Sequence, residues 1–331
     1  MPELRHNILT REWVIIATER AKRPEEFARK KEKKELPSHS PTCPFCPGNE
    51  HMTPPATRVV PGDGSWRVRV APNKFPALSK EGERLRVSQG VRRMVSGVGV
   101  HEVIVETPSH NKTTAQLDDS NVELIIQTYL DRFRFASDDP RVEQVTIFKN
   151  HGEAAGTSLE HAHSQIIGTP VVTTQVRDRL VNAVSHYDEF GECIFCRVLD
   201  IELKEKARIV LEGEHFVVFV QFAALTPFSM LIMPRRHMSV FSEMSDAEAK
   251  DLARVLRRTL AKLFYGLDDP DFNYTIRTAP TDHVGVKYYH WYLSVIPRLT
   301  RMAGFELGAG MFINVSLPEE NAEFLRHVAV E

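Results

Sequence analysis

Two histidines and a glutamine occupy alternate positions immediately after a turn of small residues. The stretch 148–165 reads FKNHGEAAGTSLEHAHSQ, and an extended backbone would put His161, His163 and Gln165 on one side of the chain. Imidazole side chains bind metal ions and act as nucleophiles near neutral pH, so the pattern is typical of a reactive site. A half-exposed strand with two histidines on its polar face would look the same, and only the rest of the chain distinguishes the two.

The four cysteines of the chain form two closely spaced pairs. Cys43 and Cys46 enclose Pro-Phe, and Cys193 and Cys196 enclose Ile-Phe. In a reducing compartment such pairs are more often metal ligands or redox centres than disulfides. Buried free cysteines and redox pairs are the alternatives to a metal site.

Length and composition are those of an ordinary globular protein. The 331 residues suffice for two domains or one large one, and 42% of them are hydrophobic. A formal net charge of −2 gives no general attraction for nucleic acid or an anionic membrane. The first residues lack the apolar core of a signal peptide, and no run approaches the ~18 apolar residues of a membrane span. We therefore expect a cytoplasmic protein without a nucleic-acid or membrane partner.

Periodicity indicates the elements that must position these side chains. One long helix is expected over 122–133, behind possible caps at 118–120. A second is expected over 252–263, behind the capping box of Ser245 and Glu248. Strands are expected at residues 9–18, 66–70, 101–106, 144–148, 209–211, 216–220, 230–233 and 273–276.

The second half of the chain repeats the plan of the first. In each half a Cys-x-x-Cys pair is followed by a histidine just past a strand end, then by a long helix and a further histidine. His110 and His161 are 51 residues apart (161 − 110), and His237 and His290 are 53 apart (290 − 237). We infer an internal duplication: an α+β protein with two mostly antiparallel sheets, each with one long helix, and halves at 1–175 and 176–331.

The duplication predicts two equivalent metal sites. Two thiolates and two imidazoles suit a tetrahedral zinc ion, and a closed set of four ligands is structural because no position is left for substrate. One or two zinc ions are expected. The predicted ligand sets are Cys43, Cys46, His110 and His161, and Cys193, Cys196, His237 and His290. His163 is then left over in the first half, and its counterpart is Tyr292.

These motifs resemble those of the galactose-1-phosphate uridylyltransferase family, a branch of the histidine-triad superfamily. The resemblance rests on His161-Ala-His163-Ser-Gln165 after a Gly-x-Ser turn, on Cys-Pro-Phe-Cys, and on Arg-Ala-Lys-Arg-Pro near the start. It covers nearly the whole chain. It implies the duplicated histidine-triad fold, a homodimer, and a double displacement in which His163 becomes a nucleotidyl-histidine. Imidazole suits that role because a covalent intermediate divides one transfer into two easier steps.

The resemblance also implies roles for other residues around the nucleophile. Gln165 and Ser158 match positions that donate hydrogen bonds to phosphate, Arg20 and Arg23 match phosphate-binding arginines, and Asn73 and Phe75 match the nucleotide-binding segment. Asn150 lies close enough in sequence to His163 to be a further candidate. Such donors would stabilise charge around phosphorus, which is what this chemistry needs.

The chain departs from the uridylyltransferases proper at several motifs. Their nucleotide segment resembles Asn-Asp-Phe-Pro, and Lys74 takes the place of the Asp in this chain. Ser164 also precedes Gln165. The C-terminal segment 304–310 reads GFELGAG and lacks the Lys-Phe and Tyr-Glu of their sugar-phosphate clamp. Together with the second Cys-x-x-Cys, these features look more like the ADP-glucose phosphorylase branch, in which inorganic phosphate accepts the nucleotidyl group.

Transfer of UMP from UDP-glucose to galactose-1-phosphate is therefore the leading hypothesis. Phosphorolysis of ADP-glucose is the close alternative. A hydrolase or phosphorylase of dinucleoside polyphosphates, and a zinc-knuckle module that binds nucleic acid or protein, are the remaining alternatives.

Overall fold

The computed structural model describes residues 1–20, 22–28, 35–62 and 65–330. The strands are β1 (Glu3–His6), β2 (Trp13–Ile16), β3 (Arg58–Val60), β4 (Val68–Pro72), β5 (Arg86–Gln89), β6 (Arg92–Val95), β7 (Val100–Val105), β8 (Gln144–His151), β9 (His163–Thr169), β10 (Ile209–Glu212), β11 (Phe216–Val220), β12 (Met230–Pro234), β13 (Phe272–Arg277), β14 (Tyr292–Pro297) and β15 (Phe312–Asn314). The helices are α1 (Asp119–Ser137), α2 (Thr174–Phe190), α3 (Ile194–Glu205), α4 (Asp246–Gly266), α5 (Gly304–Ala309) and α6 (Pro318–His327). Short 3-10 helices are η1 (Thr18–Arg20), η2 (Pro24–Phe27), η3 (Glu50–Met52), η4 (Thr114–Gln116), η5 (Glu153–Ala155) and η6 (Phe241–Glu243).

One antiparallel sheet of ten strands carries the fold, in the order β10-β11-β12-β14-β13-β8-β9-β7-β4-β3. Read from its two edges inward, the order repeats: β10, β11, β12, β14 and β13 take the places of β3, β4, β7, β9 and β8. The α+β class and the antiparallel pairing are confirmed. The two expected sheets meet where β13 pairs with β8, from Phe272 opposite His151 to Thr275 opposite Phe148, and so form one continuous sheet.

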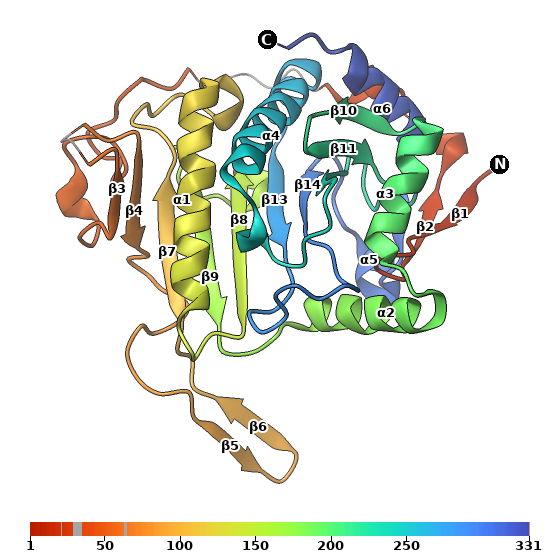
Figure 1. Cartoon of the computed structure of the whole chain (residues 1–331). Helices are drawn as coiled ribbons and strands as arrows, with labels where there is room; N and C mark the ends of the chain where they lie inside the picture. The colour runs from red at the N-terminus through yellow and green to blue at the C-terminus, as the bar shows by residue number, and fades with distance from the viewer. Residues whose placement is uncertain (21, 29–34, 63–64, 331) are drawn as a thin grey trace.

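Helices α1 and α4 lie side by side across one face of this sheet (Figure 1). As the sequence predicted, Asp118 caps α1 by accepting from the Asn121 N–H, and Ser245 with Glu248 forms the capping box of α4. The inward side chains of both helices bury one apolar core against the sheet, including Ile147 and Ile166. Because side chains alternate along a strand, the residues on either side of Ile166 along β9 face away from the helices.

Elements distant in sequence complete the C-terminal half. Strands β1, β2 and β15 form a small sheet in which β15 lies parallel to β2. Helices α2 and α3 lead from the first half of the chain to the second, and α6 packs against β10 and β11 (Figure 1). The two ends of the chain are therefore tied to the same half of the ten-stranded sheet.

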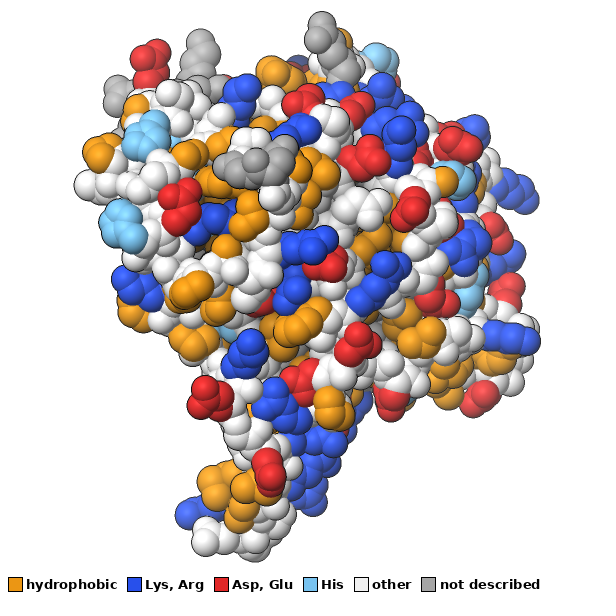
Figure 2. Space-filling model, turned by 60° about the vertical axis from the view of Figure 1, so that its left-hand side comes forward, with side chains coloured by type: hydrophobic (Ala, Val, Ile, Leu, Met, Phe, Trp, Pro, Cys, Tyr) orange, Lys and Arg blue, Asp and Glu red, His pale blue; other side chains and the backbone are white. Residues whose placement is uncertain are grey.

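A two-stranded hairpin, β5 and β6, projects from the body of the molecule (Figure 1). Its strands are almost wholly exposed, and Figure 2 shows Lys and Arg side chains gathered along it. Arg84 and Arg86 hold the base of the hairpin by donating to Glu143, each at 2.7 Å. Within the ranges that the structure describes, no helix combines the length and the apolar character that crossing a membrane requires.

Candidate functional site

The first predicted metal set converges in space from three separate segments. Cys43, Cys46, His110 and His161 are all buried, and their ligand atoms lie within 4.8 Å of one another. The His161 Nδ1 is 3.6 Å from the sulfur of each cysteine, and the His110 Nδ1 is 3.5 Å from the Cys46 sulfur. At tetrahedral angles, Zn–S bonds of about 2.3 Å and Zn–N bonds of about 2.0 Å put sulfur and nitrogen about 3.5 Å apart. The spacing of the four residues therefore fits a tetrahedral metal ion.

The second set is similar but less regular. Cys193, Cys196 and His237 bring their ligand atoms within 4.8 Å of one another. The His237 Nδ1 is 3.2 Å from the Cys196 sulfur, and the His290 Nδ1 is 3.3 Å from the same sulfur. His290 thus lies next to Cys196 as predicted, although its ligand atom is not within 4.8 Å of the ligand atoms of all three other residues. These residues too could hold a metal ion.

Hydrogen bonds and burial prepare the histidines of both clusters for a metal. The Nε2 of His161 bonds to the Thr107 carbonyl at 2.7 Å, and the Nε2 of His237 bonds to the Val286 carbonyl at 2.9 Å. Donation from Nε2 leaves the Nδ1 lone pair directed at the cysteines. Burial lowers the pKa of His161 to about 4 and that of His290 to about 3, so both imidazoles are neutral at pH 7.

His163 has the opposite ring orientation. Its Nδ1 lies 2.8 Å from the His161 carbonyl oxygen, which identifies Nδ1 as the protonated nitrogen and leaves Nε2 with the lone pair. Within the described part of the chain no hydrogen bond to this Nε2 is formed. Burial lowers the pKa of His163, so the ring is held in its neutral, nucleophilic form. The Phe45 ring, from the Cys-Pro-Phe-Cys loop, packs 5.1 Å from the His163 ring and links the metal cluster to it.

A buried ion pair lies under the strand that carries His163. Lys149, on β8, donates to Glu106, and both side chains are almost completely buried. Glu106 also accepts hydrogen bonds from Thr114 at 2.7 Å and from Tyr129 at 3.1 Å. Burial alone would raise the pKa of Glu106, but the charge of Lys149 and these hydrogen bonds outweigh burial and lower the pKa. A buried pair is retained at low cost only when its remaining hydrogen-bonding groups are satisfied, as here. The network fixes β7, β8 and α1 relative to one another beneath the site.

A large open cavity adjoins His163. Its volume is about 830 Å³, and Ser158 and Asn150 line it together with His163. The turn between β8 and β9 shapes one wall: Gly152 has φ +84°, and a Cβ there would lie 2.2 Å from the Asp271 carboxylate. Asp271 in turn accepts from the Ala154 N–H at 2.7 Å. Further carboxylates in the wall are Glu153, Glu160, Asp268 and Asp269.

Gln165, on β9, and Asn73, which follows β4, meet across the intervening strand β7. The Asn73 amide donates to the Gln165 Oε1 at 3.3 Å, and the His101 Nε2 lies 2.8 Å from the same oxygen. The Asn73 Oδ1 accepts from the Phe75 N–H at 2.9 Å, while the Phe75 ring is 82% exposed. These residues form a polar group along the same face as His163, available to a ligand that extends from the cavity.

The predicted arginines stand apart from this group. Arg23 is exposed at the start of η2 and is not among the residues that line the cavity beside His163. Arg20 ends η1, and its side chain lies outside the described residues. In the described part of the chain, no arginine lines that cavity.

Three residues around the site were not predicted from the sequence: His101, Lys149 and Glu106. His101 opens a predicted strand but belongs to no motif, so the sequence gives no sign that it contacts Gln165. Lys149 and Glu106 are 43 residues apart and belong to no motif, so nothing in the chain signals that they pair. Charged residues inside otherwise apolar strands were the one available sign.

A neutral imidazole oriented by a backbone carbonyl beside an open cavity suits an enzyme that transfers a group through a histidine. The N-terminal domain model of galactose-1-phosphate uridyl transferase matches residues 1–173, and the C-terminal domain model matches residues 148–329. The chain belongs to the galactose-1-phosphate uridylyltransferase family, and it is a nucleotidyl-transferring enzyme.

Similar proteins come from both branches of this family. ADP-glucose phosphorylase of Arabidopsis thaliana is 36% identical over 99% of this chain and 93% of its own, and galactose-1-phosphate uridylyltransferase of Thermotoga maritima is 33% identical over the whole of both. The crystal structure of the Arabidopsis phosphorylase with bound ADP-glucose superposes with a TM-score of 0.86 at 34% identity, covering 100% of both chains. A solved uridylyltransferase gives 0.75 at 27%, covering 98% of this chain and 97% of its own.

Proposed function

We propose that this enzyme transfers a nucleoside monophosphate from a nucleotide sugar through a covalent intermediate on His163. The observation that carries the proposal is the ring orientation of His163, whose Nδ1 is held by the His161 carbonyl at 2.8 Å while none of the described residues forms a hydrogen bond with Nε2. The Nε2 lone pair attacks the α-phosphorus, and the bond from that phosphorus to the oxygen of the departing sugar phosphate breaks. An acceptor phosphate oxygen then attacks the same phosphorus and releases the imidazole.

The residues around His163 are suited to hold the reacting phosphate. Ser158 and Asn150 line the cavity, and Gln165 lies two residues further along β9 on the same face as His163. These neutral side chains can donate hydrogen bonds to phosphate oxygens whose charge is redistributed in the transition state. The departing sugar phosphate is a stable anion, so the site needs no strong general acid.

Two donor and acceptor pairs fit this site, each with a supporting observation. The fit to the ADP-glucose phosphorylase, with the higher TM-score and the bound ADP-glucose of that structure, supports phosphorolysis of ADP-glucose. The full-length similarity to the Thermotoga uridylyltransferase supports transfer of UMP from UDP-glucose to galactose-1-phosphate. The chemistry at His163 is the same in both, because only the base and the acceptor differ.

Intact-mass spectrometry after separate incubation with ADP-glucose and UDP-glucose tests the proposal. We expect a mass increase of one nucleoside monophosphate with the true donor, located on His163 by peptide mapping. An AMP adduct supports the phosphorylase, and a UMP adduct supports the uridylyltransferase. The Ser158→Ala variant should form the same adduct more slowly. Turnover without any adduct would rule out the covalent intermediate.

We further propose that the enzyme is a homodimer in which the arginines near the N-terminus serve the cavity of the second copy. The support is that no arginine of the described residues lines the cavity beside His163, whose cationic side chains are Lys112 and Lys149, although the planar guanidinium group is the side chain that binds phosphate with two parallel hydrogen bonds. Mixing inactive His163→Ala and Arg23→Ala chains tests this. If Arg23 acts across the interface, mixed dimers contain one complete site and regain up to about a quarter to half of the activity; action within one chain predicts no recovery.

A further inference from the structure

His101 connects the polar group beside the nucleophile to the backbone that follows β4. The residue is half-buried on β7, and its side chain lies on the same face of the sheet as Gln165, because Val103, two residues further along, stands opposite Gln165 on β9. The His101 carbonyl accepts from the Asn73 N–H at 3.0 Å, and the His101 Nδ1 accepts from the Ala77 N–H at 2.9 Å. The imidazole ring is therefore held by a backbone group and not by a side chain that could rotate.

The hydrogen bond from Ala77 decides which ring nitrogen of His101 carries the proton. A backbone N–H can only donate, so Nδ1 is the acceptor and the ring proton is on Nε2. This Nε2 lies 2.8 Å from the Gln165 Oε1 and therefore donates to it. The Asn73 Nδ2 lies 3.0 Å from the same Nε2 and donates to the Gln165 Oε1 at 3.3 Å. Since both nitrogens carry protons, the two donors converge on one oxygen atom.

These two donors fix the orientation of the Gln165 amide. Turning the amide over would place its NH₂ group against the donors of His101 and Asn73, so that three donors would meet without an acceptor. The Oε1 is thus held on the side of His101, and the NH₂ group is left with its protons unused by the described residues. Gln165 lies two residues from His163 on the same face of β9, so these protons are available to a phosphate that His163 attacks.

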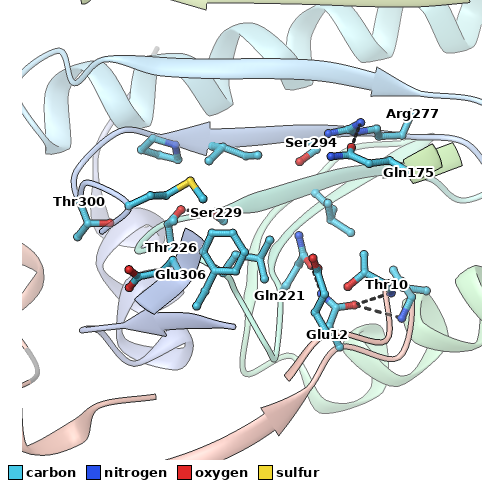
Figure 3. Close-up of a pocket in the computed structure, with 18 of the residues that line it drawn as sticks. Thr10, Glu12, Gln175, Gln221, Thr226, Ser229, Arg277, Ser294, Thr300 and Glu306 are labelled. Atoms are coloured by element: carbon cyan, nitrogen blue, oxygen red, sulfur yellow. Dashed lines mark hydrogen bonds between the residues drawn. The ribbon is translucent and has the colours of Figure 1, made fainter. Parts of the chain in front are cut away.

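The second half of the sheet, which lacks the nucleophile, lacks this arrangement as well. The pairing of β12 with β14 repeats that of β7 with β9, and in the same register Ser294 takes the place of Gln165 and Ser229 that of His101. Figure 3 shows both serines among the residues that line a cavity of the C-terminal half. The Ser229 hydroxyl lies instead 2.6 Å from that of Thr226. The imidazole–amide pair therefore occurs in the half that carries the reactive histidine and not in its structural counterpart.

We propose that His101 is a positioning residue for nucleotidyl transfer, which holds the Gln165 Oε1 so that the amide NH₂ donates to the phosphate on which His163 acts. This role rests on the proposed function, because it concerns the same reaction at His163. A donor that is already oriented stabilises the transition state without having to turn at the moment of reaction. Without His101 the amide could turn its oxygen toward the phosphate, where it would repel the anionic oxygens.

The rate of adduct formation at saturating donor tests this role, measured by quenched-flow mass spectrometry with ADP-glucose or UDP-glucose, whichever labels the unchanged protein. His101→Phe keeps a ring at this position but donates no hydrogen bond, and it should slow adduct formation about 10- to 100-fold. His101→Gln, whose amide can donate to Gln165, is the matched control and should recover part of that loss. A His101→Phe chain that needs more donor but reaches the unchanged rate at saturation would overturn the proposal, because His101 would then serve only the segment after β4.

A double-variant cycle tests whether His101 acts through Gln165. Gln165→Ala should slow adduct formation about 10²-fold, since it removes the donor itself. Adding His101→Phe should then slow the reaction no further, because no amide remains to be positioned. Effects of the two changes that multiply would contradict the proposal, and His101→Ala replaces His101→Phe in the cycle if the latter does not fold. Failure of the proposed function gives a different result, because the unchanged protein then forms no adduct with either nucleotide sugar.

Discussion

Replacing His163 with alanine is expected to abolish nucleotidyl transfer while the chain stays folded. The proposed nucleophile forms the bond to phosphorus in the first half-reaction and is the leaving group in the second, so its loss should lower kcat by at least about 10⁴-fold, and no adduct should appear in intact-mass spectra. The structural cost is small because, among the described residues, the ring forms one hydrogen bond, to the His161 carbonyl. Leaving that carbonyl unpaired should cost about 1–2 kcal/mol of unfolding free energy, measured by urea denaturation.

Two variants make this result specific to the nucleophile. His283→Ala removes a histidine of the C-terminal half that lines neither the cavity beside His163 nor a metal cluster, and it should keep normal activity. Asn150→Ala should slow the reaction without preventing the adduct, since Asn150 is proposed to bind phosphate and not to react. If the His163→Ala chain is folded and still forms the adduct, another residue is the nucleophile.

The two groups of cysteines and histidines that could hold a metal ion were predictable from the sequence because a duplication repeats residues at similar intervals. His110 and His161 lie on different segments far from Cys43 in the chain, yet the near-equal spacing in the second half identified them, and the structure brings them together. The helix caps at Asp118 and Ser245 were equally predictable, since capping depends on side chains only three residues apart.

The contacts between the halves could not be predicted in this way. The Asn273 amide donates to the Asn150 Oδ1 at 2.7 Å across the junction of β13 and β8, although the two residues are 123 positions apart. No local pattern encodes such a pairing, and the same holds for Lys149 and Glu106. Arg277 belongs to no motif either, and only the structure shows that it stands opposite Tyr292 on the neighbouring strand.

Loss of the first metal cluster should affect both stability and chemistry. We propose that the ion is zinc, since two thiolates and two imidazoles at tetrahedral spacing suit it. His161→Ala should release one zinc ion per chain, measured by elemental analysis, and should lower the free energy of unfolding by more than about 4 kcal/mol. Unchanged zinc content in this variant would contradict the assignment of His161 as a ligand.

A variant in the second cluster is the control that tests whether the first cluster affects the reactivity of His163. The backbone carbonyl of His161 holds the His163 ring, and Phe45, between the two cysteines of the first cluster, packs against it. Cys43→Ser should therefore reduce both zinc content and the rate of adduct formation. Cys193→Ser should remove a zinc ion from the other half and leave adduct formation much less affected, because no contact from its cluster reaches His163 within the described residues. Equal loss of reactivity in the two variants would mean that the metals act only through global stability.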